Sequence, residues 1–136
     1  MSDLIAPPAA RSPVEAVELV AVAVSDGDLE AALAQYERAA ALNPWAADVP
    51  PQPVGYWLRE LMDLRLPVAV SDCTVLAGRG VALVIAARQI RGTGPECERV
   101  TLCGLGSTVA RRQRGGTWVI AADAWRLAGT PDGPPR

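Results

Sequence analysis

The sequence contains no histidine, and this absence removes several mechanisms at once. A Ser-His-Asp or Cys-His catalytic set uses an imidazole as its base, so neither can be built within this chain. Zinc sites that use histidine are excluded for the same reason, and the cysteines do not form CxxC pairs. No metal site is therefore expected.

The chain has only three cysteines. Cys97 and Cys103 fall on one strand candidate, where six residues at about 3.3 Å each separate them by roughly 20 Å, too far for a disulfide. We expect free, mostly buried thiols in a reducing compartment. A nucleophilic cysteine would need an electropositive setting, and Arg99 near Cys97 is the residue that could provide it.

Lysine and phenylalanine are also missing, so all 13 basic residues are arginines. Together with an enrichment in Arg, Ala, Gly, Pro and Val, this suggests a GC-rich bacterial genome. The net charge of −2 argues against a nucleic-acid partner, because such binding depends on neutralising phosphates. The basic cluster Arg111, Arg112 and Arg114 precedes two glycines and is interpreted as the solvated tip of a hairpin, with a binding patch as the alternative.

No apolar run approaches the roughly twenty residues that span a bilayer. The longest helical candidate, residues 14–24, contains two glutamates. Residues 1–13 lack the basic segment and the apolar core of a secretory signal. We therefore expect a cytoplasmic protein with no membrane partner.

Three helices are expected in the first half of the chain. Residues 12–15, Ser-Pro-Val-Glu, match a capping box with proline in the first turn, and apolar residues at helical spacing follow to Val24. Residues 25–28 end this helix and cap a second one, which is expected to continue through Tyr36 to Ala40. The third helix follows a proline-rich loop.

That loop, residues 44–54, contains four prolines and cannot be a regular helix or a central strand. The third helix covers residues 55–64. Four strands with short, glycine-containing turns are then expected at residues 66–76, 81–91, 98–112 and 117–127. Short turns make neighbouring strands antiparallel, and glycines within the third strand permit a bulge or strong curvature.

Helices gathered at one end of a chain must cover one face of the sheet that follows, which predicts an α+β fold with two layers and a pocket between them. The chain is long enough for one domain. We expect a flexible N-terminal arm at residues 1–11, a single domain at 12–128 and a disordered C-terminal tail at 129–136.

Four strings resemble the nuclear transport factor 2-like superfamily, in its branch of small ketosteroid-isomerase-like and polyketide-cyclase-like (SnoaL-like) proteins. They are GDLEAALAQY at 27–36, GYWLRELMDL at 55–64, LAGRGVALVIAARQIRGTGP at 76–95 and VARRQRGGTWVIAADAW at 109–125. The last is the most characteristic, because a basic strand end and a glycine turn lead to Trp-x-Ile and then to an acid five residues past the tryptophan.

The resemblance implies a cone-like fold of about three N-terminal helices on a curved, mainly antiparallel sheet, often paired as a homodimer through the outer face of the sheet. It also implies cofactor-free chemistry of the cyclase or isomerase type on a hydrophobic small molecule, in bacterial natural-product (polyketide) biosynthesis. Two alternatives are a non-catalytic small-molecule-binding or accessory protein and an association module whose cavity is plugged by its own side chains. Fold similarity does not choose among them.

Asp123 is the residue to which the family's acid–base role carries over, because the cyclases have an acid seven residues after the turn glycine and Gly116 is that glycine here. Strand alternation places Asp123 on one face with Val119, Ala121 and Trp125. A carboxyl group in an apolar cavity has a raised pKa and can exchange a proton near neutrality. The indole of Trp125 could shield it and stack on a flat substrate.

The alternatives for Asp123 are a structural ion pair with Arg88, Arg91 or Arg126, an exposed acid at the strand end, and ligand binding without turnover. The steroid isomerases have a second acid near the loop after the second helix, and Asp48 is the candidate here. The tyrosine that polarises the substrate oxygen in those isomerases has no matching residue in the first helix, which counts against steroid-type isomerisation.

The remaining substrate-binding candidates are Tyr36, Trp57, Gln89 and Arg91. Gln89 and Arg91 share a strand face that excludes Arg88. If the Gln89 face is concave, Gln89 could donate to a substrate carbonyl and Arg91 could lie at the cavity mouth. Tyr36 and Trp57 are expected in the core with their polar atoms at the cavity edge.

Overall fold

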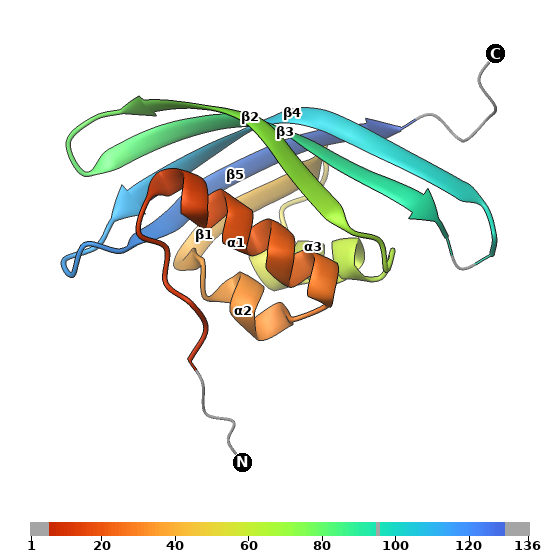
Figure 1. Cartoon of the computed structure of the whole chain (residues 1–136), viewed down its shortest axis with the longest axis horizontal. Helices are drawn as coiled ribbons and strands as arrows, with labels where there is room; N and C mark the ends of the chain where they lie inside the picture. The colour runs from red at the N-terminus through yellow and green to blue at the C-terminus, as the bar shows by residue number, and fades with distance from the viewer. Residues whose placement is uncertain (1–5, 95, 130–136) are drawn as a thin grey trace.

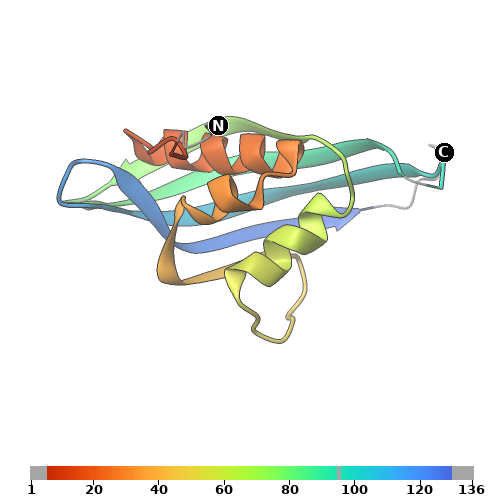
Figure 2. The same cartoon turned by 90° about the horizontal axis from the view of Figure 1, so that it is seen from below.

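The computed structural model describes residues 6–94 and 96–129, and all that follows concerns these residues. One five-stranded sheet arches over three helices, all of which lie on its concave side (Figure 1; Figure 2). The strand order is β1-β5-β4-β3-β2. The elements are α1 (Pro13–Asp26), α2 (Leu29–Leu33), β1 (Tyr36–Trp45), α3 (Val54–Met62), β2 (Val68–Ala77), β3 (Val81–Thr93), β4 (Arg99–Arg112) and β5 (Trp118–Gly129).

Helix α1 begins and ends where the sequence predicts. The Ser12 hydroxyl accepts a hydrogen bond from the Glu15 amide at 3.1 Å, and the Glu15 carboxylate accepts one from the Arg11 amide at 2.6 Å. Gly27 ends the helix with a φ of 70°, a left-handed conformation that glycine adopts without strain. The buried face of α1 packs on the concave side of the sheet and consists of Ala16, Val17, Val20, Ala21, Ala23 and Val24.

The predicted second helix is wrong beyond Leu33, because the residues expected to continue it form strand β1. β1 lies at the edge of the sheet and pairs in parallel with β5. Its run of alanines favours a helix locally, but pairing with an interior strand and burial of Tyr36 and Leu42 outweigh that propensity. The edge position also tolerates Pro44, which has no amide to donate to a neighbouring strand.

A β-bulge in β5 decides which of its side chains face the helices. Two consecutive residues of β4 pair with residues of β5 that are two apart, so Ala121 is an extra residue in the ladder. Strict alternation is therefore wrong for the first part of this strand. Ile120, in place of Ala121, is buried on the same side as Asp123 and Trp125.

Gly104 and Gly106 lie where the backbone of β5 comes close to β4. A Cβ atom at Gly104 would overlap the carbonyl group of Arg126 and would lie 2.7 Å from the carbonyl oxygen of Trp125. Arg126 itself has a φ of 57°, which is unusual within a strand. The predicted curvature is thus built from glycines on one strand and a left-handed residue on its neighbour.

Replacing Gly104 by alanine is expected to lower the free energy of unfolding by about 1–3 kcal/mol, because the new methyl group would meet backbone atoms that cannot rotate away. Chemical denaturation measures this change. Gly115→Ala is the matched control, since nothing lies within 4 Å of its Cβ position, and it should be nearly neutral. Equal effects of the two substitutions would contradict the proposed close approach.

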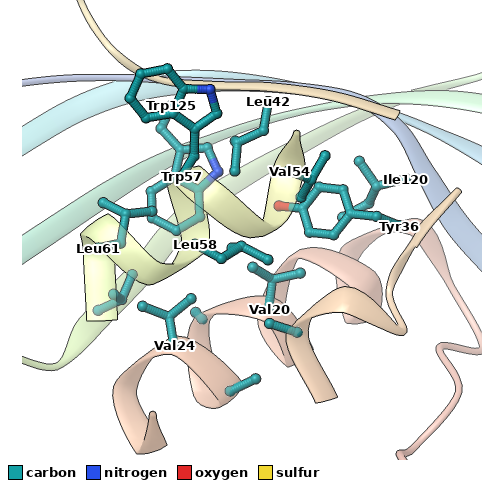
Figure 3. Packing of buried hydrophobic residues seen from close by; sticks show 14 of the residues in the cluster. Val20, Val24, Tyr36, Leu42, Val54, Trp57, Leu58, Leu61, Ile120 and Trp125 are labelled. Carbon is teal, nitrogen blue, oxygen red and sulfur yellow. The ribbon is translucent and has the colours of Figure 1, made fainter. Parts of the chain in front are cut away.

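The main core lies between the concave face of the sheet and the helices (Figure 3). It contains Trp125 and Ile120 from β5 and Trp57, Leu58 and Leu61 from α3, all buried. None of the helices in the described part of the chain is long and apolar enough to cross a membrane.

Residues 1–5 of the predicted arm and 130–136 of the predicted tail lie outside the described residues. Ala10 bridges to Trp118, so the inner end of the arm contacts the domain.

The expectation of buried thiols is wrong, because Cys73, Cys97 and Cys103 are all free and exposed.

Candidate functional site

Asp123 lies on the concave side of the sheet, and its carboxylate accepts hydrogen bonds from four side chains, of which the one from Arg88 is the longest. The Tyr36 hydroxyl and the Trp125 indole N–H donate to Oδ2 at 2.7 Å and 2.9 Å, and the Thr108 hydroxyl donates to Oδ1 at 2.7 Å. The side chain is only 1 % exposed. These donors compensate the loss of hydration that burial of a carboxylate would otherwise cost.

Arg88 supplies the opposite charge. Its Nη2 atom lies 3.5 Å from Asp123 Oδ1 and donates to the Thr108 hydroxyl at 2.8 Å, so Thr108 links the two charged groups. The guanidinium carbon is 5.1 Å from the centre of the Trp125 ring, within the range of a cation–π contact. The sequence-based alternative of an ion pair between Asp123 and Arg88 is therefore confirmed.

A second nitrogen of Arg88 lies close to the sheet. Nη1 is buried and has no hydrogen-bond partner among the described residues. A Cβ atom at Gly106 would overlap this nitrogen, so glycine at this position provides the room for the guanidinium.

Tyr36 is the ionisable group most affected by this arrangement. Burial raises the pKa of its hydroxyl well above 10.0, and the negative charge and hydrogen bond of Asp123 raise it further. Tyr36 therefore stays protonated in the folded protein and acts as a donor to Asp123.

The raised pKa of Tyr36 predicts a loss of stability in alkali. Below pH 10.0 the tyrosine is protonated whether the chain is folded or not. Above it the unfolded chain releases the proton that the folded chain keeps, so stability should fall by up to about 1.4 kcal/mol per pH unit. Denaturation between about pH 9 and 11 measures this slope, and Tyr36→Phe should reduce it. An unchanged slope in Tyr36→Phe would contradict the prediction.

Two of the predicted substrate-binding residues, Tyr36 and Trp125, meet at Asp123. Trp57 is buried in the core on α3, and Asp48 is exposed in the loop before α3. The proposed role of Gln89 required its face of β3 to be concave. The opposite face of this strand, which carries Arg88, is the one that faces the helices. Gln89 and Arg91 lie on the opposite, outer face, so they do not reach the space around Asp123.

Thr108 is the member of this cluster that was not predicted from the sequence. A single threonine in a strand carries no signal of its own. The signal that could have found the network is Arg88, the one charged residue on an otherwise apolar strand face (Ala82, Val84, Ala86 and Ile90). A buried cation requires a buried anion, and Asp123 is the acid on the apolar strand β5, which lies on the other side of β4.

A hollow of about 450 Å³ lies near the edge of the sheet formed by β1. Its walls combine outward-facing side chains of β1, β4 and β5 with the proline-rich loop at residues 49–52; Trp57 and Asp123 also border it. The outward-facing lining residues are Ala41, Asn43, Ser107, Val109, Ala122 and Ala124. The carboxylate of Asp123 itself is buried, as described above.

Solved structures with the same fold were found at low sequence identity. They include a nuclear transport factor 2-like protein from Rhodospirillum rubrum (TM-score 0.69, 18 % identity, covering 86 % of this chain and 98 % of that one). A candidate ketosteroid isomerase from Shewanella frigidimarina has a TM-score of 0.68 at 11 % identity and covers 82 % of this chain and 91 % of that one. The CaMKII hub of S. rosetta has a TM-score of 0.68 at 17 % identity, covering 93 % and 100 %.

These similarities show that the chain has the nuclear transport factor 2-like fold, as the sequence resemblance predicted. No protein-family model matches the chain, and no curated protein matches it. Because the identities are low, the comparison establishes the fold and leaves the activity to be argued from the residues.

Proposed function

We propose that this chain is a protein-association module that binds another polypeptide through the outer face of its sheet, the face opposite the helices. The observation that carries the proposal is the exposure of two large apolar side chains on that face. Leu76 on β2 is 71 % exposed and Leu105 on β4 is 62 % exposed. A soluble domain rarely leaves such side chains uncovered in a shared patch without a binding role.

The surroundings of the two leucines support the proposal. Leu76 pairs with Leu83 of β3, and Leu105 pairs with Ala87 of the same strand. Ile85 lies between Leu83 and Ala87 on the outer side of β3, so the leucines belong to a continuous apolar surface. Apolar surface of this kind provides the favourable free energy of most protein association.

The packing on the concave side also favours association over catalysis there. In the nuclear transport factor 2-like fold a substrate cavity was expected between sheet and helices, next to Asp123. Here Trp125, Trp57, Tyr36 and Leu58 pack together in that space (Figure 3). A side chain already bonded by three donors and an arginine would have to give up these partners before it could exchange a proton with a substrate.

Selection of helical peptides from a displayed random library tests the association. Bound peptides should lose binding to the double variant Leu76→Thr with Leu105→Thr, because threonine keeps strand propensity while removing the apolar anchor. Val22→Thr is the matched control, since Val22 is also an exposed apolar residue, at 57 %, but lies on α1. The proposal fails if no peptide binds, or if binding survives the double substitution.

A second candidate is the binding of a hydrophobic small molecule in the hollow beside β1. Its volume of about 450 Å³ lies in the range of small-molecule sites, and most of its lining is apolar. Ala122→Leu would fill part of this hollow from the exposed side of β5. Saturable binding of an apolar fluorescent probe that disappears in Ala122→Leu would favour this candidate, whereas unchanged binding would exclude it.

The acid–base role of Asp123 stays a prediction. It requires that Asp123→Asn abolish conversion of a hydrophobic substrate while the variant still folds. Screening of polyketide-like intermediates by mass spectrometry, with the wild-type chain and Asp123→Asn compared at equal folded concentration, tests it. Product formation by both proteins would remove the catalytic role.

A further inference from the structure

Strand β2 forms the free edge of the sheet opposite β1, so one side of its backbone has no neighbouring strand (Figure 1). In an antiparallel pair, consecutive residues direct both their N–H and their C=O alternately toward the neighbouring strand and away from it. The Gly78 amide donates to the Val81 carbonyl at 2.7 Å, which fixes this alternation at the β2–β3 turn. Counting back along the register, Leu76 faces β3, whereas Ala77 and Val75 direct their backbone groups outward.

The first part of this edge is closed within the chain. Val68 faces outward at the start of β2, and its N–H donates to the Ser25 hydroxyl of α1 at 2.8 Å. Asp72 and Cys73 then form a bulge in the pairing with β3, and Asp72 has a φ of 56°. Bonds from a neighbouring helix and bulges are both means by which native sheets prevent the addition of another strand.

The second part of the edge, residues 74–77, has no such protection. All four residues are exposed, and the sequence Thr-Val-Leu-Ala contains no charge, proline or glycine. Among the described residues, none donates to or accepts from the outward N–H and C=O groups of Val75 and Ala77. Unpaired backbone groups at an exposed sheet edge are a template for pairing with another extended chain.

An apolar hollow lies beside this open stretch. It measures about 370 Å³ and is lined only by apolar residues and glycine, among them Leu76, Val81, Leu83 and Val109. In a strand added to β2, the residue opposite Leu76 would lie on the same side of the sheet as Leu76. A large apolar side chain at that position would contact Leu76 at the rim of the hollow.

From this geometry we infer that residues 74–77 bind an extended segment of another polypeptide, which adds a strand to the free edge of the sheet. The residues on either side of its central apolar residue exchange N–H and C=O bonds with Val75 and Ala77. A helix would not suit these positions, because it uses its own backbone groups internally. This edge site shares only Leu76 with the outer face used by the proposed function and does not depend on it.

Amide hydrogen exchange measured by NMR tests whether the edge is open. In the free chain the amide of Leu76 should exchange slowly, whereas those of Val75 and Ala77 should exchange nearly as fast as in an unfolded peptide. Slow exchange of both at every protein concentration would mean that the edge is already covered. Exchange that slows as the protein concentration rises would mean that a second copy covers it. Either result overturns the inference.

A synthetic peptide with blocked ends, Lys-Lys-Thr-Leu-Thr-Lys-Lys, is the probe for binding. Its addition should shift the NMR signals of the Val75 and Ala77 amides and slow their exchange. Methylation of both threonine nitrogens removes the donors that face β2 and should weaken binding at least about tenfold. Methylation of the leucine nitrogen, which points away from β2, should leave binding nearly unchanged. Equal binding of the three peptides, or no binding, overturns the inference.

Ala77→Pro tests the same edge from the side of the protein. Proline removes the outward N–H and breaks no bond to β3, so the variant should fold and should bind the peptide at least about tenfold more weakly. The methylated peptides use the wild-type chain, so they decide the question even if this variant does not fold.

Leu105→Thr is the control that separates the edge site from the outer face. Leu105 lies two strands away on β4, so binding of the strand peptide should persist in this variant. Its loss would assign the peptide to the outer face and overturn the edge site, while the proposed function stands. The absence of any helical binder in the library selection would instead remove the proposed function and leave the edge site standing.

Discussion

Replacement of Asp123 by alanine is expected to lower the free energy of unfolding by about 3–5 kcal/mol. The substitution would leave the Arg88 guanidinium buried, 2 % exposed, without its counter-charge. It would also remove the acceptor used by Tyr36, Thr108 and Trp125. A loss of this size is a large fraction of the stability of an ordinary domain.

Urea denaturation followed by circular dichroism measures the effect, with Asp72→Ala as the control, because Asp72 is exposed on β2. Asp123→Asn keeps the shape but not the charge, so it should still be clearly destabilising. The double variant Arg88→Met with Asp123→Leu should recover part of the loss, since no unpaired charge remains. If Asp123→Asn is as stable as the wild type, the hydrogen bonds and the ion pair of Asp123 do not stabilise the fold, and the acid–base prediction gains support.

Replacement of Trp125 by alanine is the second large effect, also about 3–5 kcal/mol. Its side chain is 1 % exposed in the middle of the core, so alanine would leave a cavity in a region where neighbours cannot fully collapse. The same substitution removes the indole N–H that donates to Asp123 and the ring beneath Arg88.

Trp125→Phe separates these contributions. Phenylalanine keeps an aromatic ring and much of the packing but has no N–H group, so the loss should be smaller, about 1–3 kcal/mol. Trp45→Ala, at a partly exposed position on β1, is the control for tryptophan loss and should cost less than Trp125→Ala. Equal costs for Trp45→Ala and Trp125→Ala would contradict the central position assigned to Trp125.

Helices and strands whose ends are set by neighbouring residues were predicted correctly from the sequence. The cap at Ser12, the glycine after α1 and the glycine-containing turns each act within a few residues, and the corresponding elements occur where expected. Strand β1 could not be predicted in this way. Its alanines favour a helix locally, and the energy that makes it a strand comes from pairing with β5, more than 70 residues later.

The site was predictable in part for the same reason. An acid in an apolar strand must either find partners or take a proton, and Asp123 does have partners. Which arginine pairs with Asp123 depends on which face of β3 points toward the helices. Strand alternation divides the residues of β3 into two faces but does not say which of them points that way. The β-bulge at Ala121 could not be predicted either, because one extra residue among neighbouring alanines does not change the hydrophobic pattern of the strand.

The position of β5 has a consequence for how the protein is made. This strand lies between β1 and β4, so β1 is hydrogen-bonded to the rest of the sheet only through residues 118–129. During synthesis the ribosome releases β1 long before its neighbour exists, and native pairing of β1 must wait until residues 118–129 have emerged. A polypeptide halted before Trp118 would therefore keep β1 without its neighbour and the concave side of the sheet open, a form suited to capture by chaperones and proteases.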